Sequence, residues 1–342
     1  MPSSDKLQIT DLEFDTIKSN LTTFLKSQSQ FQDYDFEGSG MAVLVDLLAY
    51  NTHYMGYYAN MLGNEMFLDS SSLRESVVSH AKHLNVHPTS RKASRAKLDI
   101  NFFPPAIEGT NPAEYPISLT IFKDTKFTTS INGTGYTFTT NQTTTVPRLG
   151  SGDESTYSAY GVEVIEGRIL RNAFTVNGAD DTQRFIIPNS GIDVSTVVVK
   201  CQKSATDTTV ETFTDGNALD VTTIKGTDKV FFLHEVEEQK YELTFGDGAI
   251  GKSLSDGNII FVEYIVSSGT VVNKASKFSA VSSVANLNLP QYSIISVESA
   301  SGGAEAQSIE SLQFQAPKLY QAQKRATTRN DYKAIILEQR PD

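Results

Sequence analysis

The sequence has no tryptophan, a single cysteine and fewer basic than acidic residues, and each shortage narrows what the protein can be. Cys201 has no partner for an internal disulfide, which fits synthesis in a reducing cytoplasm. With 29 basic against 40 acidic residues the formal charge is −11, so the surface repels nucleic-acid backbones and anionic lipids. We therefore expect neither a nucleic acid nor a membrane as partner.

Long apolar runs and targeting signals are also missing. The longest apolar run, Met41–Val45, is interrupted by Asp46 and falls far short of the roughly 20 residues that span a bilayer. The sequence opens with Met-Pro-Ser-Ser-Asp-Lys, which is no apolar stretch, so we expect no signal peptide. A chain of 342 residues with 39% hydrophobic and 20% charged residues is typical of a folded soluble protein of two or three domains.

Motifs that would mark an enzyme or a metal site are missing too. The sequence holds no GxSxG, HExxH, EF-hand or CxxC pattern. His80, His83 and His87 have a spacing that could bind a metal on one helix face. Pro88 ends any helix beside the third histidine, so surface or interface histidines are favoured. The sequence therefore predicts no catalytic residue, no metal and no cofactor.

Helix-start signals recur in the N-terminal quarter of the chain. Thr10-x-x-Glu13 is typical of a capping box, in which each of the two side chains accepts a backbone N–H. Ser39 predicts the start of a second helix, and Ser72-x-x-Glu75 predicts the start of a third. We expect these helices to form one segment whose role is assembly.

The second predicted helix is apolar over most of its circumference. A heptad-like seam runs along it, made of Leu44, Leu47, Leu48, Asn51, Met55, Tyr58 and Leu62. Other apolar or aromatic residues lie off the seam, among them Val43, Val45, Tyr50, Tyr54, Tyr57 and Met61. Such a helix must be surrounded, and two short neighbouring helices give too little cover. We expect another chain to cover it, with the β-rich part of the same chain as the alternative.

Residues 88–290 are predicted to be rich in β-structure. Apolar and polar residues alternate in short stretches such as 98–102, and turn sequences such as Asn132-Gly133 separate them. This pattern is typical of a sandwich or a small barrel. With helical ends at 1–87 and 291–342, it predicts an α+β fold in three parts.

A basic run opens the β-rich region, made of Arg91, Lys92, Arg95 and Lys97. Because Pro88 prevents helix continuation, residues 85–97 are predicted to be a linker. A solvated connector is the favoured interpretation, and an acidic patch on a partner is the alternative.

A glycine-rich turn lies between two predicted strands, 241–245 and 259–266. Its defining residues are Phe245, Gly246, Asp247, Gly248 and Gly251. Together with Lys252 and Ser253 it fits the phosphate-binding pattern GxxxxGK[ST], which requires a helix to begin at the Lys–Ser end. Too few residues precede the next turn for a helix, so a tight strand–turn–strand is favoured over nucleotide binding. Asp247 is expected to bind local backbone amides.

The C-terminal segment 291–342 is predicted to return to helix. Ser308 marks the start of a helix that we expect to end near Pro317, and Thr328-x-x-Asp331 marks the start of a last one. A glycine pair, a proline and an Arg-Ala-x-Thr-x-x-Asp-Tyr block succeed one another in this segment. Their positions are Gly302, Gly303, Pro317, Arg325, Thr328, Asp331 and Tyr332.

The glycine-rich turn followed by these positions, in this order, resembles the baseplate J-like family. Its members are wedge subunits of the baseplate in contractile-tailed bacteriophages and related injection machines. The matching blocks cover about the last third of the chain, and the N-terminal helices resemble the larger wedge subunit of complex myovirus baseplates. Family members continue beyond the Asp-Tyr segment. Two possibilities therefore stay open: that the chain is full-length and that it is a fragment of a longer protein.

The resemblance implies a structural role and no enzymatic activity. It implies a protein of the virion tail baseplate, made in the host bacterial cytoplasm, that binds other wedge proteins and a second copy of itself but no small-molecule substrate. Two alternatives remain. A phosphate-loop NTPase would lose ATP binding on Lys252→Ala, and a receptor- or carbohydrate-binding tail protein would keep its ligand without the N-terminal helices. The lack of tryptophan weighs against a sugar-stacking cleft.

Overall fold

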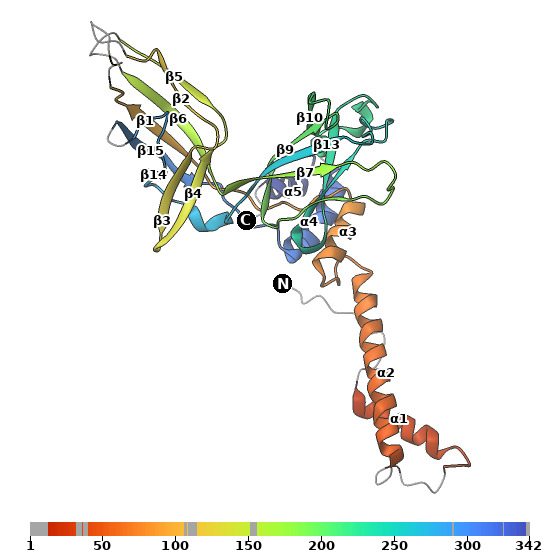
Figure 1. Cartoon of the computed structure of the whole chain (residues 1–342). Coiled ribbons are helices and arrows are strands. Elements are labelled where there is room, and N and C mark those ends of the chain that lie inside the picture. The colour runs from red at the N-terminus through yellow and green to blue at the C-terminus, as the bar shows by residue number, and fades with distance from the viewer. Residues whose placement is uncertain are drawn as a thin grey trace. The chain divides into compact units, whose positions relative to one another are not determined.

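The computed structural model describes residues 13–31, 36, 40–105, 108, 115–150, 156–288, 291–323 and 325–339. The chain forms two compact units. A helical unit contains residues 1–87 and 308–341, and a β unit contains residues 88–307. Figure 1 shows helices in the first and sheets in the second, so the predicted mixed α+β fold is confirmed.

The described residues of the helical unit form α1 (Phe14–Lys26), α2 (Gly40–Glu65), α3 (Arg74–His83), α4 (Ile309–Ala322) and α5 (Arg329–Gln339). The helix α1 packs on α2, α3 packs on α4, and α4 packs on α5. The core joins Val77 and Ala81 of α3 to Leu312 and Ala316 of α4, and all four are fully buried. These contacts bring the C-terminal helices into the same unit as the N-terminal ones.

The helix starts agree with the sequence patterns only in part. Thr10 and Ser39 lie outside the described residues. The predicted Ser72 cap of α3 is wrong, because Leu73 is the N-cap residue and makes no side-chain cap hydrogen bond. The Oε1 atom of Glu65, at the end of α2, instead accepts hydrogen bonds from the backbone N–H of Ser72 (2.8 Å) and Leu73 (3.2 Å). The Glu65 carboxylate thus takes the place predicted for the Ser72 hydroxyl at the N-terminus of α3, where the helix dipole is positive.

The predicted capping box of α5 is confirmed. The Asp331 carboxylate accepts the Thr328 N–H at 2.7 Å, and the Thr328 hydroxyl oxygen accepts the Asp331 N–H at 3.3 Å. The predicted end of α4 is wrong, because the helix continues through Pro317 to Ala322. Burial of Ala316 and Ala322 stabilises the second half of the helix against the loss of one backbone hydrogen bond at the proline.

The β unit contains a six-stranded sheet in the order β14-β3-β4-β6-β1-β15. Its strands are β1 (Arg95–Phe102), β3 (Lys126–Ile131), β4 (Thr134–Thr140), β6 (Tyr157–Glu166), β14 (Ser279–Ala280) and β15 (Tyr292–Ser301). A two-stranded sheet of β2 (Ser118–Ile121) and β5 (Thr144–Pro147) shares its core. Leu98, Ile100, Phe127 and Phe138 are completely buried in that core.

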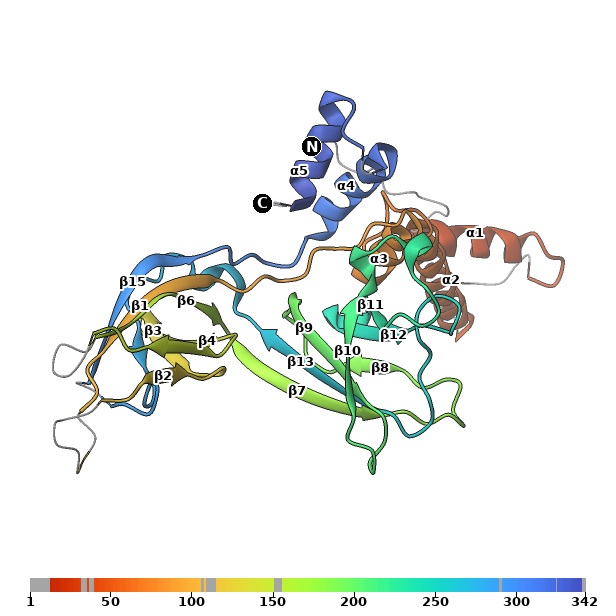
Figure 2. The same ribbon diagram turned by 90° about the horizontal axis from the view of Figure 1, so that it is seen from above.

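A seven-stranded sheet in the order β7-β13-β9-β10-β11-β12-β8 has a core of its own. Its strands are β7 (Arg168–Thr175), β8 (Phe185–Ile187), β9 (Ile192–Gln202), β10 (Val210–Asp215), β11 (Val230–Glu235), β12 (Tyr241–Phe245) and β13 (Ile259–Val266). Short 3-10 helices are η2 (Gly216–Ala218), η3 (Val221–Thr223), η4 (Glu237–Gln239) and η5 (Gly269–Val272). Figure 2 shows β7, β13 and β9 side by side in this sheet, and Cys201 of β9 is buried.

Two further expectations about the β unit are wrong. Residues 292–301 are not helical, because β15 pairs antiparallel with β1. The basic run is not a solvated linker, because β1 begins within it and its cations contact carboxylates of the same unit. These contacts are Arg91–Glu305 (2.8 Å), Arg95–Glu163 (3.1 Å) and Lys97–Glu298 (3.0 Å).

Candidate assembly surface

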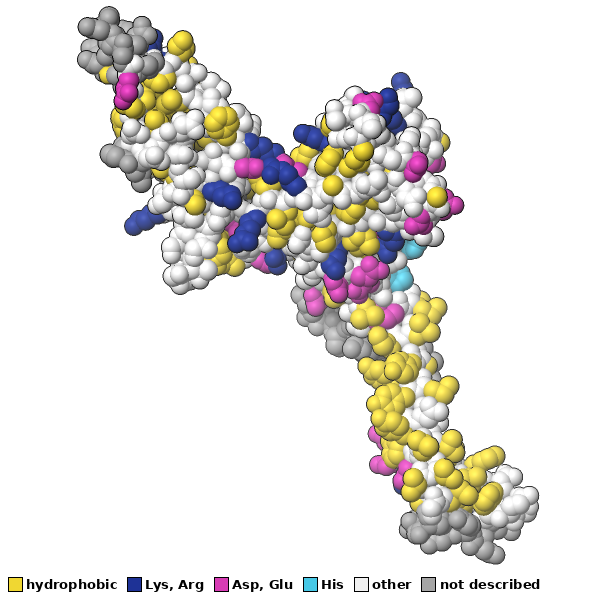
Figure 3. Space-filling view, viewed as in Figure 1, with side chains coloured by type: hydrophobic (Ala, Val, Ile, Leu, Met, Phe, Trp, Pro, Cys, Tyr) yellow, Lys and Arg dark blue, Asp and Glu magenta, His cyan; other side chains and the backbone are white. Residues whose placement is uncertain are grey.

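One side of α2 presents large apolar and aromatic side chains to solvent. Their exposed fractions run from 41% to 68%. At 3.6 residues per turn they occupy about half of the helix circumference. We call this set the apolar face of α2: Val43, Leu44, Leu47, Leu48, Tyr50, Tyr54, Met55, Tyr57, Tyr58 and Leu62. Figure 3 shows hydrophobic side chains gathered along α2 with few charged ones among them.

Tyrosines at i, i+4 spacing form a ladder along one edge of this face. The hydroxyl groups of Tyr50 and Tyr54 are 3.0 Å apart, and their ring centroids are 4.6 Å apart. The hydrogen bond between them raises the pKa of Tyr54 above its ordinary value. The ring centroid of Tyr58 lies 6.3 Å from that of Tyr54. Tyrosine has an apolar ring and a polar tip, a combination that is enriched at protein interfaces.

The opposite side of α2 carries small residues. Val45, Ala49 and Gly63 are buried there, and α1 packs on the helix. The Nζ atom of Lys18 on α1 lies 2.6 Å from Oδ1 of Asp46 on α2. The small side of α2 is therefore covered, while the side with the large apolar residues is not.

The apolar face of α2 is almost free of charge. Among its 26 residues α2 has no lysine or arginine, and Asp46 and Glu65 are its acidic residues. The exposed apolar surface continues beyond the helix at Met66, which is 64% exposed, and Phe67, which is 55% exposed. A contiguous apolar patch of this kind is typical of a protein–protein interface.

The predicted seam falls on this face. Its apolar members are at least 52% exposed, and Asn51 is an exposed polar residue among them. The seam is only part of the exposed face, because the predicted off-seam residues Val43, Tyr50, Tyr54 and Tyr57 extend it to about half of the circumference. The spacing of the tyrosines at positions 50, 54 and 58 is the signal in the sequence for that wider face. That the seam is an interface stays a prediction.

The glycine-rich turn has the geometry of a structural turn. The Oδ1 atom of Asp247 accepts the N–H groups of Ile250 (2.9 Å) and Ala249 (2.8 Å), and these bonds lower the pKa of Asp247. A Cβ added to Gly246 would lie 2.2 Å from the backbone of Gly251, so only glycine allows this close approach.

The same stretch lacks what a phosphate loop needs. No helix begins at Lys252 in the described residues 246–258. The Lys252 Nζ atom lies 2.5 Å from Oε2 of Glu211, so its charge is neutralised within the sheet. Hydrogen bonds from Lys252 and Lys229 in turn lower the pKa of Glu211. The structure thus favours the turn over nucleotide binding.

The C-terminal motif positions are divided between the two units. Gly302 and Gly303 lie in the β unit, where a Cβ on Gly303 would lie 2.2 Å from the Ser94 hydroxyl. In the helical unit Thr328 and Asp331 cap α5, Arg325 is exposed, and Pro317, Arg325 and Tyr332 lie on or beside α4 and α5. Close packing accounts for Gly303, and the helix cap accounts for Thr328 and Asp331. Tyr332, in contrast, is 55% exposed, so packing within the chain does not account for it.

His80 of α3 takes part in a contact between two helices. Its Nε2 atom lies 2.9 Å from the backbone oxygen of Glu65, so this side chain links α3 to the end of α2. Among the residues that the structure describes, no group of three His, Cys, Asp or Glu side chains could hold a metal ion. No described helix has the length and apolarity to cross a membrane.

The N-terminal helical segment is similar to a known protein family. Residues 13–85 match the family model of the helical domain of gp6-like baseplate wedge proteins. This range contains α1, α2 and α3, and with them the whole apolar face of α2.

A similarity over nearly the whole chain points to the same class. The chain is 26% identical over 361 residues to baseplate wedge protein gp6 of Enterobacteria phage T4. The match covers 95% of this chain and 49% of the relative, so the chain spans about half the length of that protein. Both similarities support a structural subunit of a phage baseplate wedge and do not favour a carbohydrate-binding protein.

Proposed function

We propose that this protein is a structural subunit of the baseplate wedge in a contractile phage tail and that it assembles through the apolar face of α2. The observation that carries the proposal is the exposure of large apolar side chains, 41% to 68%, on a helix inside the matched wedge domain. Exposure of so many uncharged side chains costs free energy in water, and a partner surface would recover it.

The partners in this proposal are other baseplate wedge proteins and a second copy of the same chain. The apolar face of α2 offers no charge to steer a partner, so a matching surface must be apolar and shaped to fit around the tyrosines. Permanent interfaces of this kind commonly bury more than about 2,000 Å². Apolar helices of neighbouring subunits would supply such an area when they pack together.

The proposal places the protein in the virion, within the tail baseplate, after synthesis in the host cytoplasm. Its action is binding and not catalysis. The baseplate J-like resemblance adds a second role, in which the region from Gly302 to Tyr332 helps to hold wedges around the tail hub. The order of the glycine pair, the α4 helix and the capped α5 helix supports this second role.

A charged substitution on the apolar face tests the proposal. Leu47→Asp replaces a side chain that is 62% exposed, so the chain is expected to fold normally. Burial of an unpaired carboxylate at an apolar interface is unfavourable, so the variant should no longer associate. Tagged protein is purified from infected cells, the bound proteins are identified by mass, and self-association is measured by sedimentation velocity.

Thr52→Asp is the matched control, because Thr52 is exposed on the same helix outside the apolar face. We expect the control to keep the partners of the unaltered chain and Leu47→Asp to lose them. Normal co-purification and self-association of Leu47→Asp would contradict the proposal. A β-rich receptor-binding protein would instead keep its ligand after deletion of the N-terminal helices.

A further inference from the structure

The six-stranded and the seven-stranded sheet of the β unit are connected at a joint built from buried groups. β6 ends at Glu166 and β7 begins at Arg168, so only Gly167 separates a strand of one sheet from a strand of the other. A Cβ on Gly167 would lie 2.3 Å from the backbone oxygen of Val266, which leaves no room for a side chain. The chain therefore crosses between the sheets where it packs against the end of β13.

Two buried carboxylates hold this joint together. Glu166 is 3% exposed and accepts hydrogen bonds from the Ser267 hydroxyl (2.8 Å) and the Ser268 N–H (2.9 Å). Asp193 of β9 is 1% exposed and accepts the N–H of Ala93, which precedes β1, at 2.9 Å. The bonds of Ser267 and Ala93 to these carboxylates are buried, so the joint is a firm point of attachment.

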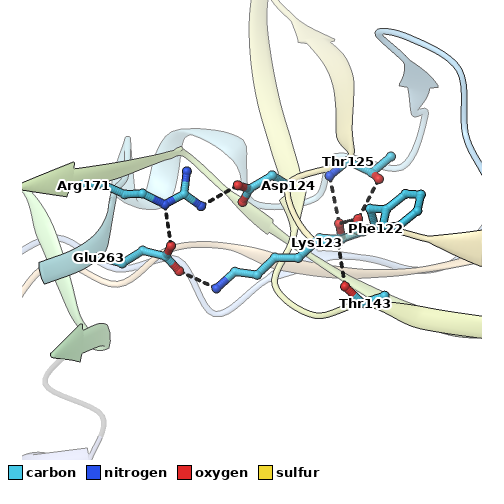
Figure 4. Close-up of polar contacts among 8 residues, drawn as sticks. Phe122, Lys123, Asp124, Thr125, Thr143, Arg171 and Glu263 are labelled. Carbon is cyan, nitrogen blue, oxygen red and sulfur yellow. Dashed lines mark hydrogen bonds and ion pairs between the residues drawn. The ribbon is translucent and has the colours of Figure 1, made fainter. Parts of the chain in front are cut away.

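A second attachment lies farther along the same strands. Arg171 on β7 and Glu263 on β13 are each four residues from the joint, about 13 Å at the usual rise per residue. Figure 4 shows Arg171 meeting Asp124 and Glu263 meeting Lys123. Lys123 and Asp124 lie in the turn between β2 and β3, and β3 belongs to the six-stranded sheet. Arg171 lies 2.6 Å from Oδ2 of Asp124, and Lys123 binds the Glu263 carboxylate.

The Lys123–Asp124 turn is held in shape before it meets the other sheet. The Thr140 hydroxyl donates to the Phe122 backbone oxygen at 2.8 Å, and the Lys123 N–H donates to the Thr143 hydroxyl at 3.1 Å. Asp124 has a φ of 69°, a left-handed conformation that aspartate tolerates well. The turn therefore holds the Lys123 ammonium and the Asp124 carboxylate in fixed positions toward the seven-stranded sheet.

The charges across this contact are complementary. Glu263 accepts from two cations, Arg171 at 2.7 Å as well as Lys123, while Arg171 contacts two carboxylates. Burial alone would raise the pKa of Glu263, but the hydrogen bonds from Lys123 and Arg171 outweigh it and hold that pKa below its ordinary value. Networks of this kind hold their geometry better than isolated surface pairs.

We propose that the Lys123–Asp124 turn is a brace that fixes the angle between the two sheets, and that the sheets turn about Gly167 when its ion pairs are broken. One attachment permits rotation, whereas two attachments about 13 Å apart prevent it. The pairs of the brace are partly exposed, with Lys123 at 35% and Glu263 at 23%, so a competing charge can reach them. The brace is independent of the apolar face of α2.

Distance measurement between two spin labels tests the brace in the full chain. Labels are attached to cysteines at the exposed residues Thr134 of β4 and Thr208 of the β9–β10 turn, after Cys201→Ala removes the native thiol. Lys123→Glu places a carboxylate against Glu263. Lys126→Glu makes the same charge change at an exposed position three residues away and is the matched control.

We expect one narrow distance distribution for the unaltered chain and for Lys126→Glu, and a broader, shifted one for Lys123→Glu. Inversion of the whole network, with Lys123→Glu, Asp124→Lys, Arg171→Glu and Glu263→Lys together, recreates every pair and should restore the narrow distribution. Circular dichroism confirms folding, and the milder Asp124→Asn is measured in the same way. A distribution for Lys123→Glu that coincides with that of the unaltered chain would overturn the proposal. So would an inverted network that stays broad while its circular dichroism is native.

Discussion

The strand β13 and the helix α2 are both rich in apolar residues, but most of these are buried in β13 and exposed in α2. In β13, Ile260, Val262 and Tyr264 are at most 1% exposed, because the strand lies between β7 and β9 and above the sheet's own core. In α2, Leu47 is 62% exposed, since one short helix packs along it. Apolar content predicts that a surface will be covered, and the surrounding structure decides whether the same chain covers it.

The largest expected effect comes from truncating one buried leucine of the β unit and, for comparison, one exposed leucine of α2. Leu98 in β1 is fully buried, so Leu98→Ala should lower the free energy of unfolding by about 2–5 kcal/mol. Leu47→Ala on the apolar face should change it by no more than about 0.5 kcal/mol, because no cavity forms. Denaturant unfolding of both variants measures the contrast. Equal losses would mean that the apolar face of α2 is already covered within the chain.

A smaller effect is expected from adding one methyl group at the joint of the β unit. Gly167 has a φ of 119°, and its added Cβ would meet backbone atoms, so Gly167→Ala should cost about 2–3 kcal/mol. Gly135→Ala is the control, because a Cβ there meets nothing within 4 Å. Thermal unfolding distinguishes the two variants. A Gly167→Ala chain as stable as the control would show that the joint has room to adjust.

In the helical unit, the cap of α5 tests whether this helix is stabilised by a local hydrogen bond or by its packing on α4. Thr328→Ala removes the hydroxyl that accepts the Asp331 N–H and should cost α5 about 1 kcal/mol. Thr328→Ser keeps an equivalent oxygen and should retain most of the stability. Hydrogen exchange of the α5 amides measures the difference. Equal exchange in both variants would indicate that packing on α4, and not the cap, holds the helix.

The smallest effect concerns a single exposed carboxyl in the β unit. Hydrogen bonds from Thr209, assisted by Lys203, lower the pKa of Asp207 to about 2. Because the folded pKa is depressed, the stabilisation is present above the ordinary value of 3.8 and is lost as the pH falls toward 2. Carboxyl NMR titration measures this pKa directly. Thr209→Ala removes the hydroxyl but keeps the backbone N–H that donates to Asp207, so it should raise this pKa part of the way toward 3.8. An unchanged value in that variant would exclude the Thr209 hydroxyl as a cause.

Local signals predicted several elements well because each depends on neighbouring residues. The alternation in β12, the β-branched and aromatic residues of β13, the turn at Asp247 and the capping pair Thr328–Asp331 are all local features of the chain. The Ser72 cap failed for the opposite reason. Its place is taken by Glu65, a residue of the preceding helix that the capping pattern does not include.

Elements that depend on distant partners could not be predicted in the same way. Residues 292–301 form a strand because β1, far away along the chain, offers an edge to pair with. The helix α4 passes through Pro317 because α3 and α5 pack on it. Arg95 and Lys97 contact Glu163 and Glu298, which no local pattern links to them.

The sequence by itself determined that α2 is a sparsely charged, tyrosine-rich helix and that the glycine-rich turn joins two strands, because period and turn chemistry are local properties. Only the tertiary structure decided that the large side chains of α2 face solvent while its small side chains pack within the helical unit. It alone also brought Lys123 and Asp124 to Glu263 and Arg171. Such contacts join residues far apart in the chain, and the folded arrangement of both sheets is what makes them meet.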